Sequence, residues 1–271
     1  MKKLLVFTDL DATLLDHETY SYAPALPAIA RLQHDGHVLI LNSSKTQAEQ
    51  AALREDLGNT APFVVENGAA IACPPNTPGH HEDSATATLH VLGADYAHLR
   101  HVVCQLRQDN GYRFRGFGDM SADDIAQITG LSLTAAVAAK QRNGSEPLLW
   151  EDTDDARSRF ITQINAAGLH VTQGGRFLHV MGKTDKGAGV QWLAERYRQR
   201  FPDIFWQVVA LGDSPNDLPM LRAADVGVLI PNPHRKAFAV EGVTRLLKPE
   251  QPGPKGWAVA IAQLLNELGD R

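Results

Sequence analysis

The sequence predicts an α/β protein with a doubly wound, mainly parallel core sheet of Rossmann-like type and an inserted α+β cap. Two observations lead to this prediction. Short apolar runs alternate with helical patterns at both ends of the 271-residue chain, and a long middle segment interrupts the alternation. The predicted core is therefore discontinuous, residues 1–83 and 183–271, and the predicted cap covers residues 84–182.

The first half of the core alternates strands with helices. Apolar runs too short for a helix predict buried strands at residues 3–8, 37–42 and 62–71. Helical spacing of apolar residues predicts helices over residues 24–35 and 46–58. The third strand run includes a turn at Asn67-Gly68. Short links between these elements favour a parallel sheet.

The insertion follows a different pattern. A loop rich in Pro, Thr and His, residues 74–88, marks its start. Helices are predicted over residues 93–109, 121–129, 132–142 and 155–168. Strands are predicted over residues 112–117 and 147–152, with a β-hairpin over 169–181 that turns at Gly174-Gly175. The irregular order of these elements favours an antiparallel sheet backed by helices.

The core pattern resumes after the insertion. Strands are predicted over residues 207–213 and 226–230, and helices over residues 186–201, 217–224 and 257–268.

Charge and composition exclude several classes of protein. A net charge of −5, with 44% hydrophobic residues, fits a globular protein without a basic surface for nucleic acid or membranes. The apolar run after the two N-terminal lysines is too short for a signal peptide, and no apolar stretch is long enough to cross a bilayer. Cys73 and Cys104 lack the spacing of a metal site or redox pair. We therefore expect a cytoplasmic protein with reduced thiols.

Polar clusters follow three of the predicted core strands. They are Asp9-Leu10-Asp11, Asn42-Ser43-Ser44-Lys45 and Gly212-Asp213-Ser214-Pro215-Asn216-Asp217. In open parallel sheets, ligands bind just beyond the carboxyl ends of the strands, so we expect these clusters to meet at one crevice. Lys186, at the start of a core helix, is expected to reach the same place.

A pair of aspartates two residues apart is weak by itself, because such pairs arise often by chance. Asp152-Thr153-Asp154 is a second such pair, and it is best interpreted as a surface loop or helix cap. The pair at Asp9 and Asp11 differs because the other clusters accompany it in the core.

The predicted chemistry follows from charge. Crowded carboxylates repel one another unless a cation lies among them. Only oxygen ligands are available, from Asp9, Asp11, Asp213 and Asp217, which favours Mg²⁺. Asp9 is the predicted nucleophile that forms an aspartyl-phosphate, and Asp11 the general acid and base. Ser43 and Lys186 are predicted to hold the phosphoryl oxygens. For Asp217, direct metal binding and support of the metal site both remain open.

These residues resemble the motifs of the haloacid dehalogenase superfamily of phosphohydrolases. The four matching segments are FTDLDATLLD (7–16), Ser43, Lys186 in DKG, and GDSPND (212–217). The resemblance implies that Asp11 offers its backbone carbonyl to the metal, leaving its carboxylate free for proton transfer. Ala12 departs from the family pattern, which has glycine there, and a left-handed backbone would strain an alanine.

The long insertion between the second and third motifs resembles the cap of sugar phosphatases in this superfamily. RGFGDMS (115–121), TGL (129–131) and RNGSEP (142–147) look like cap segments of the mannosyl-3-phosphoglycerate phosphatases. This resemblance implies a small-molecule substrate, a phosphorylated glycoside, from which phosphate is removed to give mannosylglycerate. A broader sugar phosphatase, a glucosyl-3-phosphoglycerate phosphatase and a phosphomutase remain alternatives.

A substrate of this kind carries a phosphate, a carboxylate and sugar hydroxyls, which require cations and amide or backbone groups. In the cap, the candidates are Arg113, Arg115, Arg142, Gln173, Gly174, Gly175, Arg176 and His179. In the core, they are Ser44, Lys45, Glu66, Asn67 and Asn216.

Two other classes of protein also use or retain an acidic cluster. A response-regulator receiver has its phosphoacceptor aspartate on a middle strand and is less than half this length. A catalytically idle binding module would have lost Asp9, Asp11, Lys186 or Asp213, and all four are present.

Overall fold

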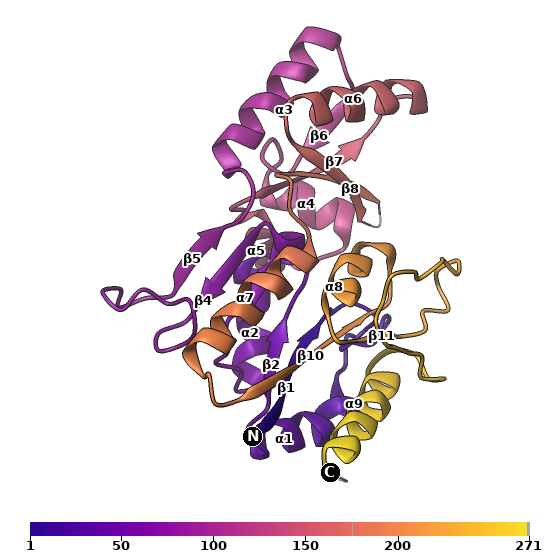
Figure 1. Ribbon diagram of the computed structural model, residues 1–271. Helices are drawn as coiled ribbons and strands as arrows, with labels where there is room; N and C mark the ends of the chain where they lie inside the picture. Colours follow the sequence, from indigo (N-terminus) through magenta and orange to yellow (C-terminus); the bar gives the residue numbers. More distant parts are fainter. Residues whose placement is uncertain (175, 270–271) are drawn as a thin grey trace.

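The computed structural model describes residues 1–174 and 176–269 of the chain. Two layered regions lie one above the other, with both chain termini at the lower end of the lower region (Figure 1). The lower region contains the first and last parts of the chain, and the upper region its middle part. This arrangement confirms the predicted fold class of a parallel α/β core with an inserted α+β cap. The domain boundaries near residues 83 and 183 stay predictions.

The core sheet has five parallel strands in the order β12-β11-β10-β1-β2. Their bounds are β1 Lys2–Thr8, β2 Val38–Leu41, β10 Phe205–Gly212, β11 Val226–Leu229 and β12 Leu246–Leu247. Along β1, Leu4 and Val6 face one side of the sheet, and Leu5 and Phe7 the other; all four are buried. A strand covered on both faces requires a continuous apolar run, which explains the pattern seen in the sequence.

Helices cover both faces of this sheet. Helices α1 (Leu26–His34) and α9 (Gly253–Gly269) pack on the face that carries Leu4. Helices α7 (Lys186–Arg200) and α8 (Leu218–Ala223) pack on the opposite face. The sheet is therefore doubly wound, as predicted.

The third predicted strand does not continue the five-stranded sheet. Residues 62–71 instead form β3 (Phe63–Val65) and the start of β4 (Ala70–Cys73), which pair antiparallel. With β5 (Thr88–Val91) they make a separate three-stranded sheet, joined to β2 by one bridge between Asn42 and Val64. The tight turn at residues 66–68 reverses the chain, so a hairpin forms where a further parallel strand was expected. Helix α2 (Gln47–Asp56) links β2 to this hairpin.

The cap contains an antiparallel sheet in the order β6-β7-β9-β8. Its strands are β6 Phe114–Gly116, β7 Ser145–Trp150, β8 His170–Gly174 and β9 Phe177–Met181. Helices α3 (Tyr96–Asn110) and α6 (Asp154–Ala166) cover its outer face, away from the core (Figure 1). Helices α4 (Ala122–Thr129) and α5 (Leu133–Lys140) lie between this sheet and the core.

Alternation along β9 decides which cap residues reach the core side. Leu178 and Val180 pack with α3 and α6, whereas Phe177 packs with the α4 and α5 cluster. His179 shares the face of Phe177, because side chains two apart in a strand point the same way. This face of the cap sheet is the one that looks toward the carboxyl edge of the core sheet.

Two short sequence patterns in the cap have the structural roles that were predicted for them. Ser121 caps α4, and Asp124 completes a capping box with it. The aspartate pair interpreted as non-catalytic flanks the start of α6, where Thr153 is the N-cap and Asp152 accepts the backbone N–H of Arg113.

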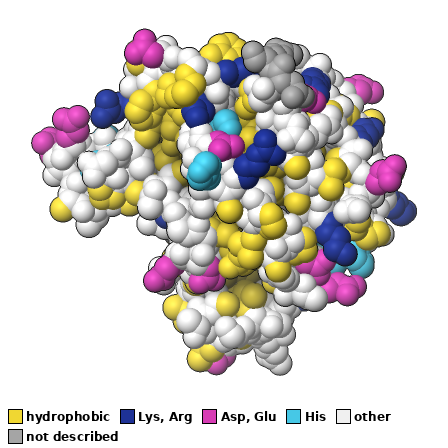
Figure 2. Space-filling model, turned by 90° about the horizontal axis from the view of Figure 1, so that it is seen from below, with side chains coloured by type: hydrophobic (Ala, Val, Ile, Leu, Met, Phe, Trp, Pro, Cys, Tyr) yellow, Lys and Arg dark blue, Asp and Glu magenta, His cyan; other side chains and the backbone are white. Residues whose placement is uncertain are grey.

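Charged side chains of both signs are scattered over the face that carries the termini (Figure 2). Among the helices of the described residues, none combines the length and apolar character needed to cross a membrane.

The cap core predicts a clear stability effect at Phe160. This fully buried ring contacts Tyr112, Phe114 and Trp150. We expect Phe160→Ala to lower the free energy of unfolding by about 3–5 kcal/mol, through lost burial and the resulting cavity. Urea denaturation measures the change. Phe205→Ala, at a ring that is 65% exposed, should change it by less than about 0.5 kcal/mol and serves as the control. Equal losses in both variants would contradict this assignment of the cap core.

Candidate active site

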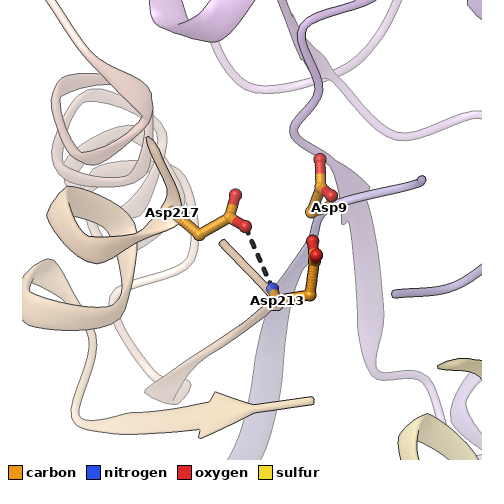
Figure 3. Close-up of side chains that lie close together, drawn as sticks. All are labelled: Asp9, Asp213 and Asp217. Atoms are coloured by element: carbon orange, nitrogen blue, oxygen red, sulfur yellow. Dashed lines mark hydrogen bonds between the residues drawn. The ribbon is translucent and has the colours of Figure 1, made fainter. Parts of the chain in front are cut away.

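Three aspartates from two neighbouring strand ends meet at the carboxyl edge of the core sheet (Figure 3). Asp9 follows β1, Asp213 follows β10, and Asp217 ends the short helical turn Pro215–Asp217. One carboxylate oxygen from each lies within 4.8 Å of the others, and all three residues are buried. The parallel register of β1 on β10, with Thr8 opposite Leu211, brings these strand ends together.

Lys186 supplies the cation nearest to this cluster. Its Nζ lies 2.6 Å from Oδ1 of Asp9 and 2.6 Å from Oδ1 of Asp217. Burial by itself would lower the pKa of Lys186, but Asp217 and Asp9 raise it above the usual value. Lys186 therefore carries its positive charge although its side chain is fully buried. The first turn of α7 holds it, and Asp185 caps that turn.

The Asp217 carboxylate is occupied by donors from its own loop. Its Oδ2 accepts the backbone N–H groups of Asp213 and Ser214 and the Ser214 hydroxyl, each at 3.0 Å. Gly212 permits this arrangement, because a Cβ at that position would lie 2.4 Å from the Asp217 side chain. Asp217 therefore shapes the loop that presents Asp213.

The remaining negative charge of the cluster strongly favours binding of a cation. Burial raises the pKa of Asp9 well above its usual value; Lys186 opposes the shift, and Asp217 and Asp213 add to it. Burial and the neighbouring Asp217 also raise the pKa of Asp213. Lys186 contacts Asp9 and Asp217, and the Arg235 guanidinium lies 3.8 Å from Asp213 Oδ2, so two cations face three carboxylates. A hard divalent cation fits this all-oxygen set of donors, and Asp9 and Asp213 are its best-placed side-chain ligands.

Several residues support the site, and of these Trp257, Thr8 and Asn232 were not predicted from the sequence. The indole of Trp257 donates to Thr8 Oγ1 (2.9 Å), whose hydroxyl donates to the Asp9 carbonyl (2.7 Å). Asn42 Nδ2 donates to the Lys186 carbonyl (3.0 Å), and Asn232 Nδ2 to Asp213 Oδ2 (2.6 Å). Asn232 could have been predicted as a site residue, because it closely follows the end of β11, as the polar clusters follow their strands.

The cluster opens into a cavity of about 360 Å³ between core and cap. Predicted site residues that line it are Asp9, Asp11, Ser44, Lys45, Arg142, Arg176, His179, Asp213 and Asn216. Lys186 and Asp217 lie in the buried layer next to it. Asp11 lies at the cavity wall, where Lys45 Nζ contacts its Oδ1 at 3.1 Å.

Other predicted residues lie elsewhere. Ser43 is fully buried, and its Oγ accepts the backbone N–H of Lys45 (3.2 Å). Asn67 and Gln173 line a second groove of about 810 Å³, which shares Asn216 with the cavity. Asn216 Nδ2 donates to Asn67 Oδ1 at 3.1 Å, so the two spaces meet at this pair. Glu66 is fully buried.

Of the predicted glycine pair, one residue belongs to a strand of the cap hairpin. Gly174 is the last residue of β8, and Gly175 lies outside the described residues.

The candidate cations of the cap differ in their surroundings. Arg142 is almost fully buried; it donates to the Ala139 carbonyl and to Ser145 Oγ (3.2 Å). Arg176 is exposed and donates to the Ile128 carbonyl. Arg115 and Arg113 are exposed and pair with Glu151 and Asp152.

His179 is neutral, which corrects its interpretation as a cation. Burial, with a smaller contribution from Arg142, lowers its pKa to about 3. The ring lines the cavity, and its Nδ1 is buried without a hydrogen-bond partner. A neutral imidazole can serve as a donor or acceptor for a hydroxyl group, but not as the counter-ion of a carboxylate.

Comparison with known proteins assigns the family. The family model of haloacid dehalogenase-like hydrolases matches residues 6–241. Two relatives share the name glucosyl-3-phosphoglycerate/mannosyl-3-phosphoglycerate phosphatase. The Methanococcoides burtonii protein is 38% identical over 273 residues, and the Persephonella marina protein 36% identical over 270 residues. Each comparison covers 98% of this chain and 98% of the relative.

A solved Thermoplasma acidophilum structure agrees with the fold. It has a TM-score of 0.70 at 16% identity and covers 98% of this chain and 99% of its own. The chain therefore belongs to the haloacid dehalogenase-like hydrolase family. The resemblances to this superfamily and to its mannosyl-3-phosphoglycerate phosphatases are confirmed.

Ala12 adopts the left-handed conformation that would strain it, with φ +60°. An L residue in this region costs about 1–2 kcal/mol, and glycine avoids that cost while losing some chain entropy on folding. We expect Ala12→Gly to raise the free energy of unfolding by about 1 kcal/mol. Urea denaturation tests this. Ala52→Gly, at an exposed position inside α2, should lower the same quantity by about 1 kcal/mol. A loss in both variants would show that Ala12 is not strained.

The lowered pKa of His179 predicts acid sensitivity. Below pH 6.5 the unfolded imidazole binds a proton that the folded one does not, so acidification toward pH 3 favours unfolding. Between pH 7 and pH 5 this group should remove about 2 kcal/mol of stability. His179→Phe should therefore lose about 2 kcal/mol less than wild type over that interval in urea denaturation. An unchanged pH dependence would exclude a buried neutral His179.

Proposed function

We propose that this chain is a Mg²⁺-dependent phosphatase that acts through an aspartyl-phosphate on Asp9 and removes phosphate from mannosyl-3-phosphoglycerate. The observation that carries the proposal is the buried cluster of Asp9, Asp213, Asp217 and Lys186, which opens into a cavity beneath the cap. In this proposal, a nucleophile and its countercharges adjoin a cavity that can hold a substrate. Membership of the hydrolase family and the relatives named as phosphatases support the enzyme class.

Asp9 is the proposed nucleophile. Its carboxylate oxygen attacks phosphorus, the bond from phosphorus to the ester oxygen breaks, and Asp11 gives a proton to the leaving oxygen. Asp11 then takes a proton from water as that water attacks phosphorus, which releases inorganic phosphate and regenerates Asp9. The position of Asp11 at the cavity wall beside Lys45 supports this role, because its carboxyl group is 42% exposed and within reach of a substrate in the cavity.

Countercharge is the second requirement of the reaction. Lys186 contacts Asp9 and supports the negative charge that develops on the phosphoryl oxygens. In the proposal, Ser43 and the neighbouring Ser44 help to hold these oxygens. Asp9 and Asp213, with the backbone carbonyl of Asp11, would hold Mg²⁺, and Asp217 would support them. When bound, Mg²⁺ supplies positive charge that offsets the repulsion between the carboxylates and the substrate phosphate.

The substrate class follows from the cavity and the relatives. Lys45, Arg142 and Arg176 line the cavity and are proposed to bind the glycerate carboxylate, with Arg115 as a further candidate cation at the cap. Gln173, with Gly174, Gly175, Asn67 and Asn216, is proposed to contact sugar hydroxyls. The names of the relatives support a glycosyl-3-phosphoglycerate, and the glucosyl ester is the second candidate substrate.

Phosphate release from a panel of esters tests the proposal. The panel holds mannosyl- and glucosyl-3-phosphoglycerate, 3-phosphoglycerate, hexose phosphates and p-nitrophenyl phosphate, each with Mg²⁺. We expect the highest kcat/KM with mannosyl-3-phosphoglycerate and loss of turnover when EDTA removes the metal. Activity spread evenly over hexose phosphates would discard the named substrate, and transfer between sugar positions without release would indicate a phosphomutase.

Asp9→Asn tests the nucleophile. We expect turnover to fall by at least about 10³-fold, because an amide cannot form the phosphoryl bond, while the fold stays intact. Wild-type and variant protein are compared by phosphate release and by circular dichroism. A variant that keeps more than a tenth of wild-type turnover would remove Asp9 from this role.

A further inference from the structure

The loop of residues 66–69 is fixed to the core at several points. Glu66 N–H donates to the Lys45 carbonyl (3.0 Å), and Asn67 N–H donates to the Ser43 carbonyl (2.9 Å). Gly68 lies against the start of α7, where an added Cβ would be 1.9 Å from the Asp185 carbonyl oxygen. The loop is therefore part of the rigid edge of the core, next to two of the sequence motifs of the site.

The backbone of this loop is unusual. Glu66, Asn67 and Gly68 have consecutive positive φ values of +53°, +57° and +92°. Side-chain-bearing residues rarely adopt this conformation, and it persists only where the surroundings enforce it. The conformation turns the Glu66 side chain toward the cap, as its hydrogen bonds show.

The Glu66 carboxylate binds the cap at the start of β7. It accepts the backbone N–H groups of Asn143 (2.8 Å) and Gly144 (3.2 Å) and the Ser145 hydroxyl (2.7 Å). Glu66 and Ser145 are almost completely buried. Asn143 Nδ2 is a fourth donor, at 3.4 Å. A buried carboxylate with four donors from one short segment holds that segment strongly, because losing it would leave the donors unpaired.

Ser145 continues this contact to the cavity. Its hydroxyl donates to Glu66 and accepts from Arg142 Nη1 at 3.2 Å, and Arg142 lines the cavity. A chain of contacts therefore runs from the core loop through Glu66 and Ser145 to a cation of the cap.

We propose that Glu66 is a positioning residue that seats the cap on the core and, through Ser145, sets Arg142 for the carboxylate-bearing part of the substrate. This proposal rests on the proposed function for the identity of the substrate. It departs from the expectation that Glu66 itself binds the substrate, since its carboxylate is already satisfied by the cap. Binding of substrates that carry a carboxylate depends on this placement of the cap, and binding of simple aryl phosphates does not.

Glu66→Gln is the main test, because the amide keeps the shape but places an N–H group among donors. We expect KM for mannosyl-3-phosphoglycerate to rise on the order of 30-fold, with kcat within about threefold. For p-nitrophenyl phosphate, both constants should stay within about threefold. Hydrogen exchange of the amides at 143–145 should accelerate at least about tenfold.

Glu146→Gln is the matched control. Glu146 is equally buried, but its partners Tyr96, Arg100 and Gly118 all belong to the cap. This variant should speed exchange within the cap while leaving the amides at 143–145 close to wild type. Ser145→Ala tests the same chain if Glu66→Gln does not fold, and it should raise KM for the glycosyl substrate on the order of tenfold.

Equal losses on both substrates in Glu66→Gln, or unchanged exchange at 143–145, would overturn the proposal. A change in kcat alone for the glycosyl substrate would do the same. If wild-type protein releases phosphate from no ester, the proposed function fails, and hydrogen exchange in Glu66→Gln still decides whether Glu66 seats the cap.

Discussion

The arrangement of the site depends on three buried carboxylates that lie close together. Asp9, Asp213 and Asp217 lie within 4.8 Å of one another, and Lys186 contacts two of them. Such a cluster is unfavourable without compensation, because each buried charge is removed from water and repels its neighbours. The Arg235 guanidinium lies 3.8 Å from Asp213 Oδ2, and the negative charge that remains makes the cluster suited to a divalent cation. The buried charges of the cluster reduce the stability of the folded protein, and the same charges allow the site to bind a cation.

The surrounding structure holds this unfavourable cluster in place. Asp217 accepts three donors from its own loop, Asn232 supports Asp213, and the Asn42 amide holds the Lys186 carbonyl. Trp257, on the last helix of the chain, reaches the end of β1 through Thr8. Segments from both halves of the discontinuous core are therefore needed to build one site, which explains why the insertion can separate them in sequence without separating them in space.

The contact between core and cap has a different character. The hairpin of β3 and β4 leaves the parallel sheet and carries a loop that faces the cap. Glu66 in this loop holds the segment at Asn143–Ser145, and the Thr46 hydroxyl donates to the Ala138 carbonyl of α5. Polar contacts of this kind are directional, so they fix the cap to the core at defined residues.

Residues near one another in the chain made most of the fold and the acidic cluster predictable. The apolar run before Asp9 predicted a central strand, because a strand covered on both faces has no polar side. Ser121 predicted the start of a helix, because its side chain caps the first turn. The strand-end rule then predicted that Asp9 and Asp213 meet, and Lys186 was predicted to reach them from the start of a core helix. Contacts between distant residues decided the rest. The burial of Glu66 and the neutrality of His179 depend on neighbours far along the chain, because desolvation and hydrogen-bond partners are properties of the packed molecule.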